Sequence, residues 1–340
     1  NNYRSRSGQG KVSFTHLIGF AIVRAIADAV PNMANTFVAG ADGKPRLIRN
    51  EHVNMGLAVD VSKSDGSRTL VVPVLRDADT LDFAGFLGAY EELIRKVKNN
   101  KLAVSDFQGA TITLTNPGTI GTVQSVPRLM PGQGVIVGVG SIDYPAEFQG
   151  ADEHALGSLG ISKVVTVTST YDHRIIQGAE SGLFLKRVHE LLLGDHGFYE
   201  SVFQSLGVPY ESVKWRPDVN PINREDAMLH KQMQVATLIR VHRVRGHLIA
   251  DLDPLRWKEP TMPPELDPAT YGLTIWDLDR EFLTGGVGGT EKLPLGDLLG
   301  MLRDAYCRTI GVEYMHIQDF AEQRWVQAKL EGATWQLDKT

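Results

Sequence analysis

The chain has 340 residues, of which 42% are hydrophobic and 22% charged, which is typical of about two globular domains with buried cores. The formal net charge of -5 comes from 35 basic and 40 acidic residues, so charge gives no reason to expect nucleic acid or an anionic membrane as a partner. The only cysteine, Cys307, excludes an internal disulfide and a multi-cysteine metal site within the chain, and it fits a reducing cytoplasm.

The first part of the chain begins with two predicted helices and two predicted strands. Apolar residues recur at helical spacing over residues 14–30, where a proline ends the pattern, and a second helix is predicted over residues 82–100. Strand-like segments lie between them at residues 52–61 and 68–75. The turn-rich sequence SKSDGS joins these segments and predicts an antiparallel pair.

Three further strands and one helix complete this part. The strands are predicted at residues 109–116, 132–140 and 162–171, and the helix at residues 179–193. The glycines of GQGVIVGVG have dinucleotide-like spacing, but the apolar run continues as a strand and opens no helix, which indicates a core strand. Helices interleaved with a mixed sheet predict an α/β or α+β domain of about 195 residues.

After Gly194 the sequence turns to prolines, aromatic residues and charges with little periodicity, and we expect a linker at residues 197–222. From Asn223 onward apolar residues recur at helical offsets, and LGDLLGMLRDAYCRTIGVEY contains another predicted helix. The second part of the chain is therefore expected to be mainly helical.

The joint between the last strand and helix of the first part contains a histidine, His173. An imidazole that titrates near pH 6.5 can accept a proton from a thiol, whose thiolate is the reactive nucleophile. A histidine at a strand end more often caps or packs. The residues alone leave both roles open.

A second candidate is Thr115, which ends a predicted strand just before an Asn-Pro-Gly turn. A hydroxyl held at a rigid turn can donate to the oxyanion that forms during acyl transfer. Turn chemistry alone favours a role in which Thr115 satisfies backbone groups. This position also stays open.

The second part of the chain offers weaker candidates. Its basic cluster is most simply a solvated helix end whose cations complement the helix dipole. The residues of this cluster are Arg240, His242, Arg243, Arg245 and His247. His247, Asp251 and Asp253 lack a further anchor for a metal site, and Cys307 lies in an apolar helical pattern that predicts a buried packing residue. We expect no metal site here.

Four segments of the first part occur in the order and spacing of a known family. They are KVSFTHLIGFAIVRAI, HVNMGLAVDV with RTLVVPVLRDADTL, TITLTNPGTIGT, and STYDHRIIQGAESGLFLKRVHELL. In this order they resemble the catalytic domain of 2-oxo-acid dehydrogenase acyltransferases, in the dihydrolipoamide succinyltransferase branch, over about residues 11–194. The resemblance implies a chloramphenicol-acetyltransferase-like fold, a mixed sheet with helices.

The resemblance also implies roles for the two candidates. In the family, the histidine of an Asp-His-Arg-x-x-Asp-Gly motif activates the thiol of CoA or dihydrolipoamide, and a Ser or Thr before the Asn-centred turn stabilises the oxyanion. These positions correspond to His173 and Thr115. Where the family has its second Asp, this chain has Gln177. That carboxylate is given a structural role, so we expect a hydrogen-bonded arrangement without net charge in its place.

The second part of the chain resembles the N-terminal part of the thiamine-dependent 2-oxoglutarate dehydrogenase component. The matching segments are RVRGHLIADLDPL, YGLTIWDLDREF and MLRDAYCRTIGVEYMHIQDFAEQRWVQAKLE. The two parts in this order resemble the actinobacterial multifunctional 2-oxoglutarate enzymes. We therefore expect an acyltransferase domain at residues 1–196, incomplete at its N-terminus, and an incomplete helical domain at residues 223–340.

These resemblances imply succinyl transfer between dihydrolipoamide and CoA in a cytoplasmic enzyme of the tricarboxylic acid cycle. Thiamine diphosphate and Mg²⁺ would serve the full-length enzyme and not this piece, which contains no Gly-Asp-Gly motif. The expected partners are the lipoyl domain of a separate acyltransferase component, the lipoamide dehydrogenase complex and further copies of the chain, since relatives form trimers with sites between subunits. The alternative is a non-catalytic scaffold or an acyl-CoA-binding regulatory module.

Overall fold

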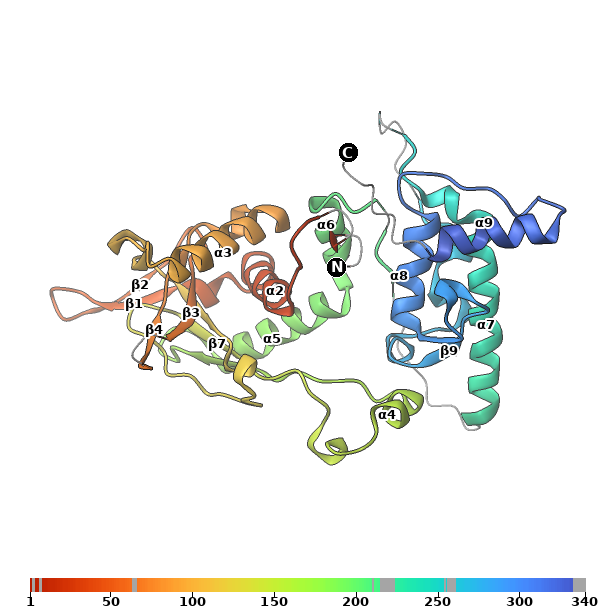
Figure 1. Ribbon diagram of the computed structural model, residues 1–340. Helices are drawn as coiled ribbons and strands as arrows, with labels where there is room; N and C mark the ends of the chain where they lie inside the picture. The colour runs from red at the N-terminus through yellow and green to blue at the C-terminus, as the bar shows by residue number, and fades with distance from the viewer. Residues whose placement is uncertain are drawn as a thin grey trace. The chain divides into compact units, whose positions relative to one another are not determined.

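The chain divides into two compact units in a computed structural model (Figure 1). The structure describes residues 1, 4–5, 8–62, 66–209, 211–214, 224–253, 255 and 261–332. The sheet unit comprises Val12–Asp143 and Lys163–Leu206, and the helical unit comprises Asn1–Lys11, Tyr144–Ser162 and Gly207–Thr340. Among the helices in these described ranges, none has both the length and the apolar character that crossing a bilayer requires.

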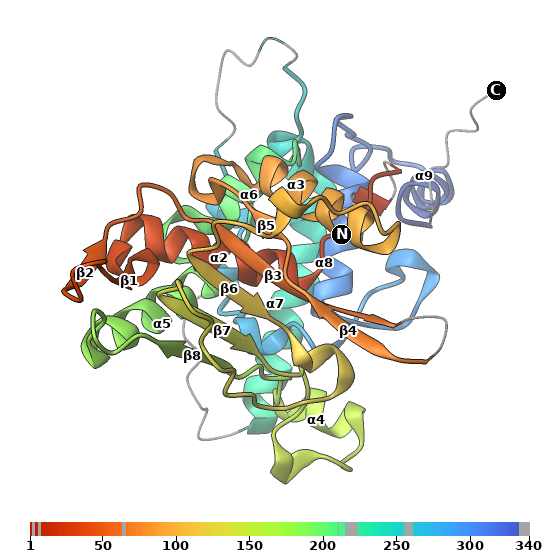
Figure 2. The same ribbon diagram turned by 90° about the vertical axis from the view of Figure 1, so that its left-hand side faces the viewer.

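A mixed sheet forms the centre of the sheet unit, in the order β4-β3-β6-β7-β8, with β5 also paired to β3 (Figure 2). The strands are β3 (Met55–Ser62), β4 (Arg68–Val71), β5 (Val74–Leu75), β6 (Ile112–Thr115), β7 (Val135–Val139) and β8 (Val167–Tyr171). Strands β3, β6 and β7 are parallel, whereas β4, β5 and β8 run antiparallel to their neighbours. The predicted mixed sheet and the antiparallel pair are thus confirmed.

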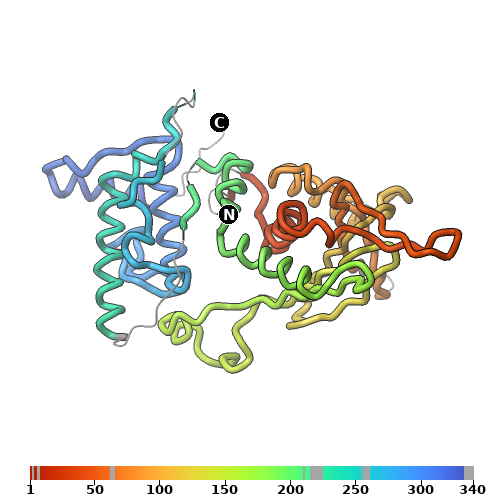
Figure 3. The backbone as a smooth tube through the Cα atoms, turned by 180° about the vertical axis from the view of Figure 1, so that it is seen from behind, coloured from red at the N-terminus to blue at the C-terminus, as the bar shows by residue number. Residues whose placement is uncertain are grey.

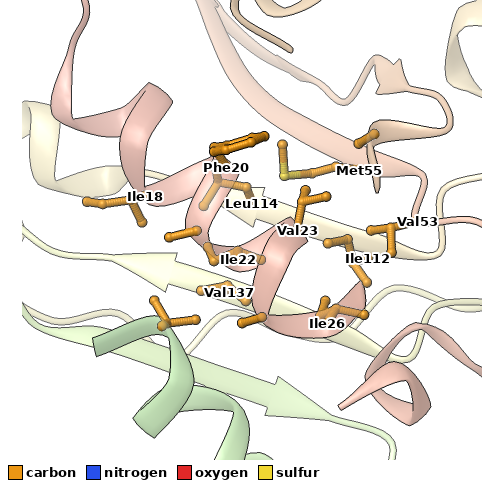
Figure 4. Packing of buried hydrophobic residues seen from close by; sticks show 14 of the residues in the cluster. Ile18, Phe20, Ile22, Val23, Ile26, Val53, Met55, Ile112, Leu114 and Val137 are labelled. Carbon is orange, nitrogen blue, oxygen red and sulfur yellow. The ribbon is translucent and has the colours of Figure 1, made fainter. Parts of the chain in front are cut away.

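Helices α2 (Phe14–Asp28), α3 (Phe83–Lys98) and α5 (Gly178–Leu193) pack their apolar stripes into one core with the sheet. In Figure 4, Ile22 and Ile26 of α2 lie against Ile112 and Val137 of the strands. Gly19 allows this approach, because a Cβ there would lie 3.3 Å from Leu114 and 3.2 Å from Phe86. The predicted helices are confirmed, and their apolar spacing places the core between helices and sheet.

Two further elements of the sheet unit were not predicted. The hairpin of β1 (Thr36–Ala39) and β2 (Pro45–Ile48) projects from the unit (Figure 3). Helix α6 (Phe198–Ser205) begins within the expected linker at residues 197–222 and buries Phe198 and Val202 in the core. That expectation does not hold for residues 198–205, and part of the remaining linker lies outside the described residues.

The helical unit contains α7 (Arg224–Arg245), α8 (Leu295–Tyr306) and α9 (Phe320–Gly332), with a hairpin of β9 (Glu281–Leu283) and β10 (Lys292–Pro294). The mainly helical second part is therefore confirmed. Helix α4 (Glu153–Leu159) belongs to this unit although its sequence lies between β7 and β8. An antiparallel bridge between Asp143 and Val164 closes the base of this excursion.

Candidate active site

The joint between β8 and α5 is organised by Asp172, which is only 8% exposed. Its backbone N–H makes the last ladder hydrogen bond, to the carbonyl of Gly134 at 3.0 Å. Its carbonyl accepts from the N–H groups of Ile175 and Ile176, at 3.1 and 2.9 Å, while Oδ1 accepts from the N–H of Arg174 at 3.1 Å. The chain therefore leaves the sheet at Asp172 and turns, with its polar backbone groups satisfied.

Arg174 closes this turn from the other side. Its Nε and Nη2 donate to the two carboxylate oxygens of Asp172, at 2.8 and 2.5 Å, and its guanidinium lies 3.7 Å from the ring centroid of Phe37 in β1. The hydrogen bonds from Arg174 lower the pKa of Asp172. The carboxylate therefore stays ionised at neutral pH, and the clamp persists until the pH falls below the usual range of an aspartate.

His173 lies between these two clamped residues and is exposed. Its ring centroid is 5.5 Å from that of Tyr171, and no described residue makes a hydrogen bond with its imidazole. The arrangement holds the backbone of His173 at a defined place and leaves both ring nitrogens accessible. A proton acceptor for an incoming thiol requires both features.

The start of α5 fixes the other end of this loop. Glu180 accepts from the backbone N–H of Gln177 at 2.7 Å and from Asn32 Nδ2 at 2.8 Å, and Asn32 also donates to the carbonyl of Ile175 at 3.0 Å. Asn32, Glu180 and Phe37 were not found from the sequence. Only Glu180 had a local signal, because it stands three residues after the N-cap position Gln177.

Gln177 itself is exposed, and no described residue makes a hydrogen bond with its side chain. The prediction that Gln177 takes part in a hydrogen-bonded arrangement in place of the family's carboxylate is therefore wrong. The physical reason is local: Gln177 is the N-cap of α5, and the capping interaction there uses its backbone and the side chain of Glu180.

Thr115 is the last residue of β6 and is half-buried. No described residue makes a hydrogen bond with its hydroxyl. The turn that follows is tied down, because Asn116 Nδ2 donates to the hydroxyl of Thr15 in α2 at 2.8 Å. Gly118 is required there, since a Cβ would lie 2.1 Å from the carbonyl oxygen of Gly140. A free hydroxyl thus stands at a rigid strand end.

The sheet register separates the two candidates within one chain. Thr115 pairs with Gly138, which pairs with Thr168, so Thr115 and Thr168 lie in one row across the sheet. From Thr168 the strand continues to Tyr171, which at about 3.3 Å per residue is about 10 Å along the strand direction, and His173 lies beyond that end. The fold of one chain therefore does not bring His173 and Thr115 together.

The basic cluster of the helical unit is only in part the solvated helix end that its sequence predicts, because Arg240 and Arg245 are exposed whereas His242 and Arg243 are not. His242 is 1% exposed, and burial lowers its pKa to about 4. Arg243 donates to both carboxylate oxygens of Glu331, at 2.6 and 2.9 Å, and Tyr306 donates to the same carboxylate at 2.7 Å. The sequence could not show that Glu331, far along the chain, supplies a buried partner for Arg243.

Cys307 is fully buried, as its apolar surroundings predict. Burial raises the pKa of its thiol to about 12, so the thiol stays protonated at neutral pH. A protonated, buried thiol is not an effective nucleophile. Cys307 is a packing residue.

The chain is 54% identical over 334 residues to the multifunctional 2-oxoglutarate metabolism enzyme of Mycobacterium sp. (strain JLS), covering 98% of this chain and 26% of that protein. It is 53% identical over 333 residues to the protein of the same name from Mycolicibacterium vanbaalenii, covering 97% and 26%. The chain thus spans about a quarter of the length of the curated relatives it matches.

A probable dihydrolipoamide acetyltransferase from Listeria monocytogenes matches with a TM-score of 0.44 and 25% identity, over 55% of this chain and 73% of that one. The family of 2-oxoacid dehydrogenases acyltransferases (catalytic domain) matches residues 1–196. This match covers more than half of the chain and includes Thr115 and His173. The chain therefore belongs to the 2-oxoacid dehydrogenase acyltransferase family.

Proposed function

We propose that the sheet unit transfers a succinyl group between dihydrolipoamide and CoA, with His173 as general base and Thr115 as oxyanion donor. The observation that carries this proposal is the unpartnered, exposed imidazole of His173 between the clamped residues Asp172 and Arg174. The free hydroxyl of Thr115 supports the second role. Relatives named for 2-oxoglutarate metabolism favour a succinyl group as the acyl substrate.

In this mechanism, the imidazole of His173 takes the proton from the thiol of CoA. The thiolate attacks the thioester carbonyl of succinyl-dihydrolipoamide, and the hydroxyl of Thr115 donates a hydrogen bond to the oxyanion that forms. The intermediate then expels the dihydrolipoamide thiolate, which receives the proton back from the imidazolium. General base catalysis typically contributes about 10² to 10⁴-fold, and one oxyanion donor about 3 kcal/mol.

The two residues act together only if they come from different copies of the chain. Within one chain they lie at opposite ends of the sheet, because β6 is parallel to β7 whereas β8 is antiparallel to it. A symmetric oligomer places the same two surfaces of neighbouring subunits together at each interface. We infer that His173 of one subunit faces Thr115 of the next, in agreement with the trimers that the family resemblance implies.

In the whole enzyme we place this step after a thiamine-dependent decarboxylation of 2-oxoglutarate in the tricarboxylic acid cycle of the cytoplasm. The Gly-Asp-Gly motif by which the thiamine-dependent component holds thiamine diphosphate and Mg²⁺ is absent from the 340 residues, so we expect these residues not to bind that cofactor. The succinyl group would arrive on the lipoyl domain of a separate acyltransferase component, and lipoamide dehydrogenase would reoxidise the carrier.

The rival proposal is a scaffold or acyl-CoA-binding regulator that keeps the fold without turnover. The exposed Gln177, which replaces the family's carboxylate, is the observation that favours it. Steady-state transfer from succinyl-dihydrolipoamide to CoA separates the two proposals. A scaffold binds CoA and shows no turnover, whereas the proposed enzyme turns over.

The test of His173 uses the full-length enzyme. His173→Ala should lower succinyl-CoA formation by at least about 10², because the thiol then loses its proton acceptor, and should leave thiamine-dependent decarboxylation unchanged. His189→Ala is the matched control, since His189 is exposed on α5 and has no assigned role. Activity of the His173→Ala variant within tenfold of wild type would refute the assignment.

A further inference from the structure

The sheet unit contains a cavity of about 440 Å³ whose lining residues include neither His173 nor Thr115. The walls come from the C-terminal halves of α2 and α5, and from the first turns of α3 and α6, four helices that gather on one side of the sheet (Figure 1). Sites for small organic ligands typically measure about 300 to 1,000 Å³. The cavity is therefore large enough for a small molecule.

Three phenylalanine rings form the inner wall of this cavity. Phe20 lies 5.3 Å from Phe83 and 5.8 Å from Phe198 between ring centroids. All three side chains belong to the core of the sheet unit, so this wall is held rigidly. Phe20, Phe83 and Phe198 are 4%, 1% and 3% exposed, so this wall is preformed but presents only a small apolar area to a ligand.

The rim of the cavity carries an arginine whose donors are largely unused. Arg187 is 29% exposed and lies 3.7 Å from the carboxylate of Glu190, and no described residue accepts a hydrogen bond from its guanidinium. The other arginine, Arg24, donates to both carboxylate oxygens of Asp28, at 2.7 and 2.9 Å. The fork of Arg187 is thus the one that remains open to a ligand.

Three basic side chains lie near one carboxylate on the Arg187 side of the cavity, while Asp28 is paired with Arg24. The carboxylate of Glu190 lies 3.8 Å from the amine of Lys186, 3.7 Å from the guanidinium of Arg187 and 3.1 Å from the ring of His196. Two permanent cations and a histidine therefore share one negative charge. The opposite rim holds Asp82, whose carboxylate caps α3 by accepting from the N–H of Gly85 at 2.8 Å.

We propose that this cavity binds a small amphipathic anion, a carboxylate or a phosphate monoester that carries a compact apolar group. The anionic oxygens contact Arg187 and His196, and the apolar group lies against Phe20, Phe83 and Phe198. The site is separate from the proposed acyl-transfer residues, and the proposal stands whether or not those residues act as assigned.

Calorimetric titration of the full chain with benzoate, phenyl phosphate and uncharged benzyl alcohol tests this proposal. At least one anion should bind saturably and more tightly than benzyl alcohol, and the comparison of the two anions shows whether carboxylate or phosphate is preferred. Arg187→Gln should weaken that anion about tenfold or more, since charge-assisted hydrogen bonds contribute about 1.5 to 3 kcal/mol. The affinity of Arg187→Lys for the anion should lie between those of the wild type and Arg187→Gln, because lysine keeps the charge.

Lys186→Gln is the matched control, because Lys186 shares the carboxylate of Glu190 but does not line the cavity. It should change the affinity less than twofold. Equal binding of benzyl alcohol and the anions, unchanged binding by Arg187→Gln, or no saturable binding of either anion at millimolar concentration would each overturn the proposal.

Discussion

At the residue scale, the hydroxyl of Thr115 and the imidazole of His173 share one property, which is that no described residue makes a hydrogen bond with either. Each lies beside a residue that does have strong partners: Asn116 is bound to Thr15, and Asp172 is bound to Arg174. Rigid neighbours with a free functional group between or beside them are a common arrangement at catalytic sites. The sequence indicated both residues through motif resemblance, but it did not show that Asn116 would contact Thr15 or that Arg174 would contact Phe37, because these partners are distant in sequence.

Replacing Thr115 by Val keeps the branched shape and removes the hydroxyl. If the hydroxyl contacts the oxyanion only in the transition state, kcat should fall by about 10² with little change in KM for CoA. Thr115→Ser restores the hydroxyl and should recover most of the rate. A large rise in KM at unchanged kcat would instead assign Thr115 to substrate binding.

Gln177→Asp probes the departure from the family motif. Because Gln177 is exposed and is the N-cap of α5, an aspartate there should stabilise the helix start or leave it unchanged, with a gain of up to about 1 kcal/mol. Thermal denaturation near neutral pH measures this effect. A clear fall in the midpoint would show that the side chain occupies a neutral, enclosed environment in the assembled protein.

At the scale of elements, periodicity predicted the helices and strands that meet in the core of the sheet unit, because burial on one face imposes a regular apolar spacing. Two of the elements it missed, β2 and α4, lack that signal. Residues of β2 are exposed throughout, and α4 is only seven residues long. Helix α4 also packs within the helical unit, where Gly157 lies against the carbonyl oxygen of Asp279, so its partner lies more than a hundred residues away in sequence.

The packing of α4 can be tested at Gly157, which is buried. A Cβ there would lie 2.8 Å from the carbonyl oxygen of Asp279, so Gly157→Ala should lower the thermal midpoint although alanine favours a helix over glycine by about 0.5 to 1 kcal/mol. Gly88→Ala in α3 is the control, because a Cβ there meets nothing within 4 Å and should raise the midpoint. Stabilisation by both changes would contradict the packing described here.

At the scale of the whole molecule, the sequence indicated two consecutive parts. The structure also shows two units, but one segment of the first part in sequence belongs to the second unit in space. Residues 144–162 lie between two strands of the sheet unit in sequence and belong to the helical unit in space. The expected functional domain boundaries therefore stay a prediction, because the two compact units are not contiguous in sequence. The separation of His173 and Thr115 within one chain likewise appears only once the register of β6, β7 and β8 is known.

The most direct test of a shared active site co-assembles two inactive variants, His173→Ala and Thr115→Val, in one oligomer. Each variant alone lacks one residue at every site. In a randomly mixed cyclic assembly, about a quarter of the interfaces would join an intact His173 from one subunit to an intact Thr115 from its neighbour. The account predicts that co-assembly restores succinyl transfer to about a quarter of the wild-type rate, whereas no gain over the separate variants would contradict it.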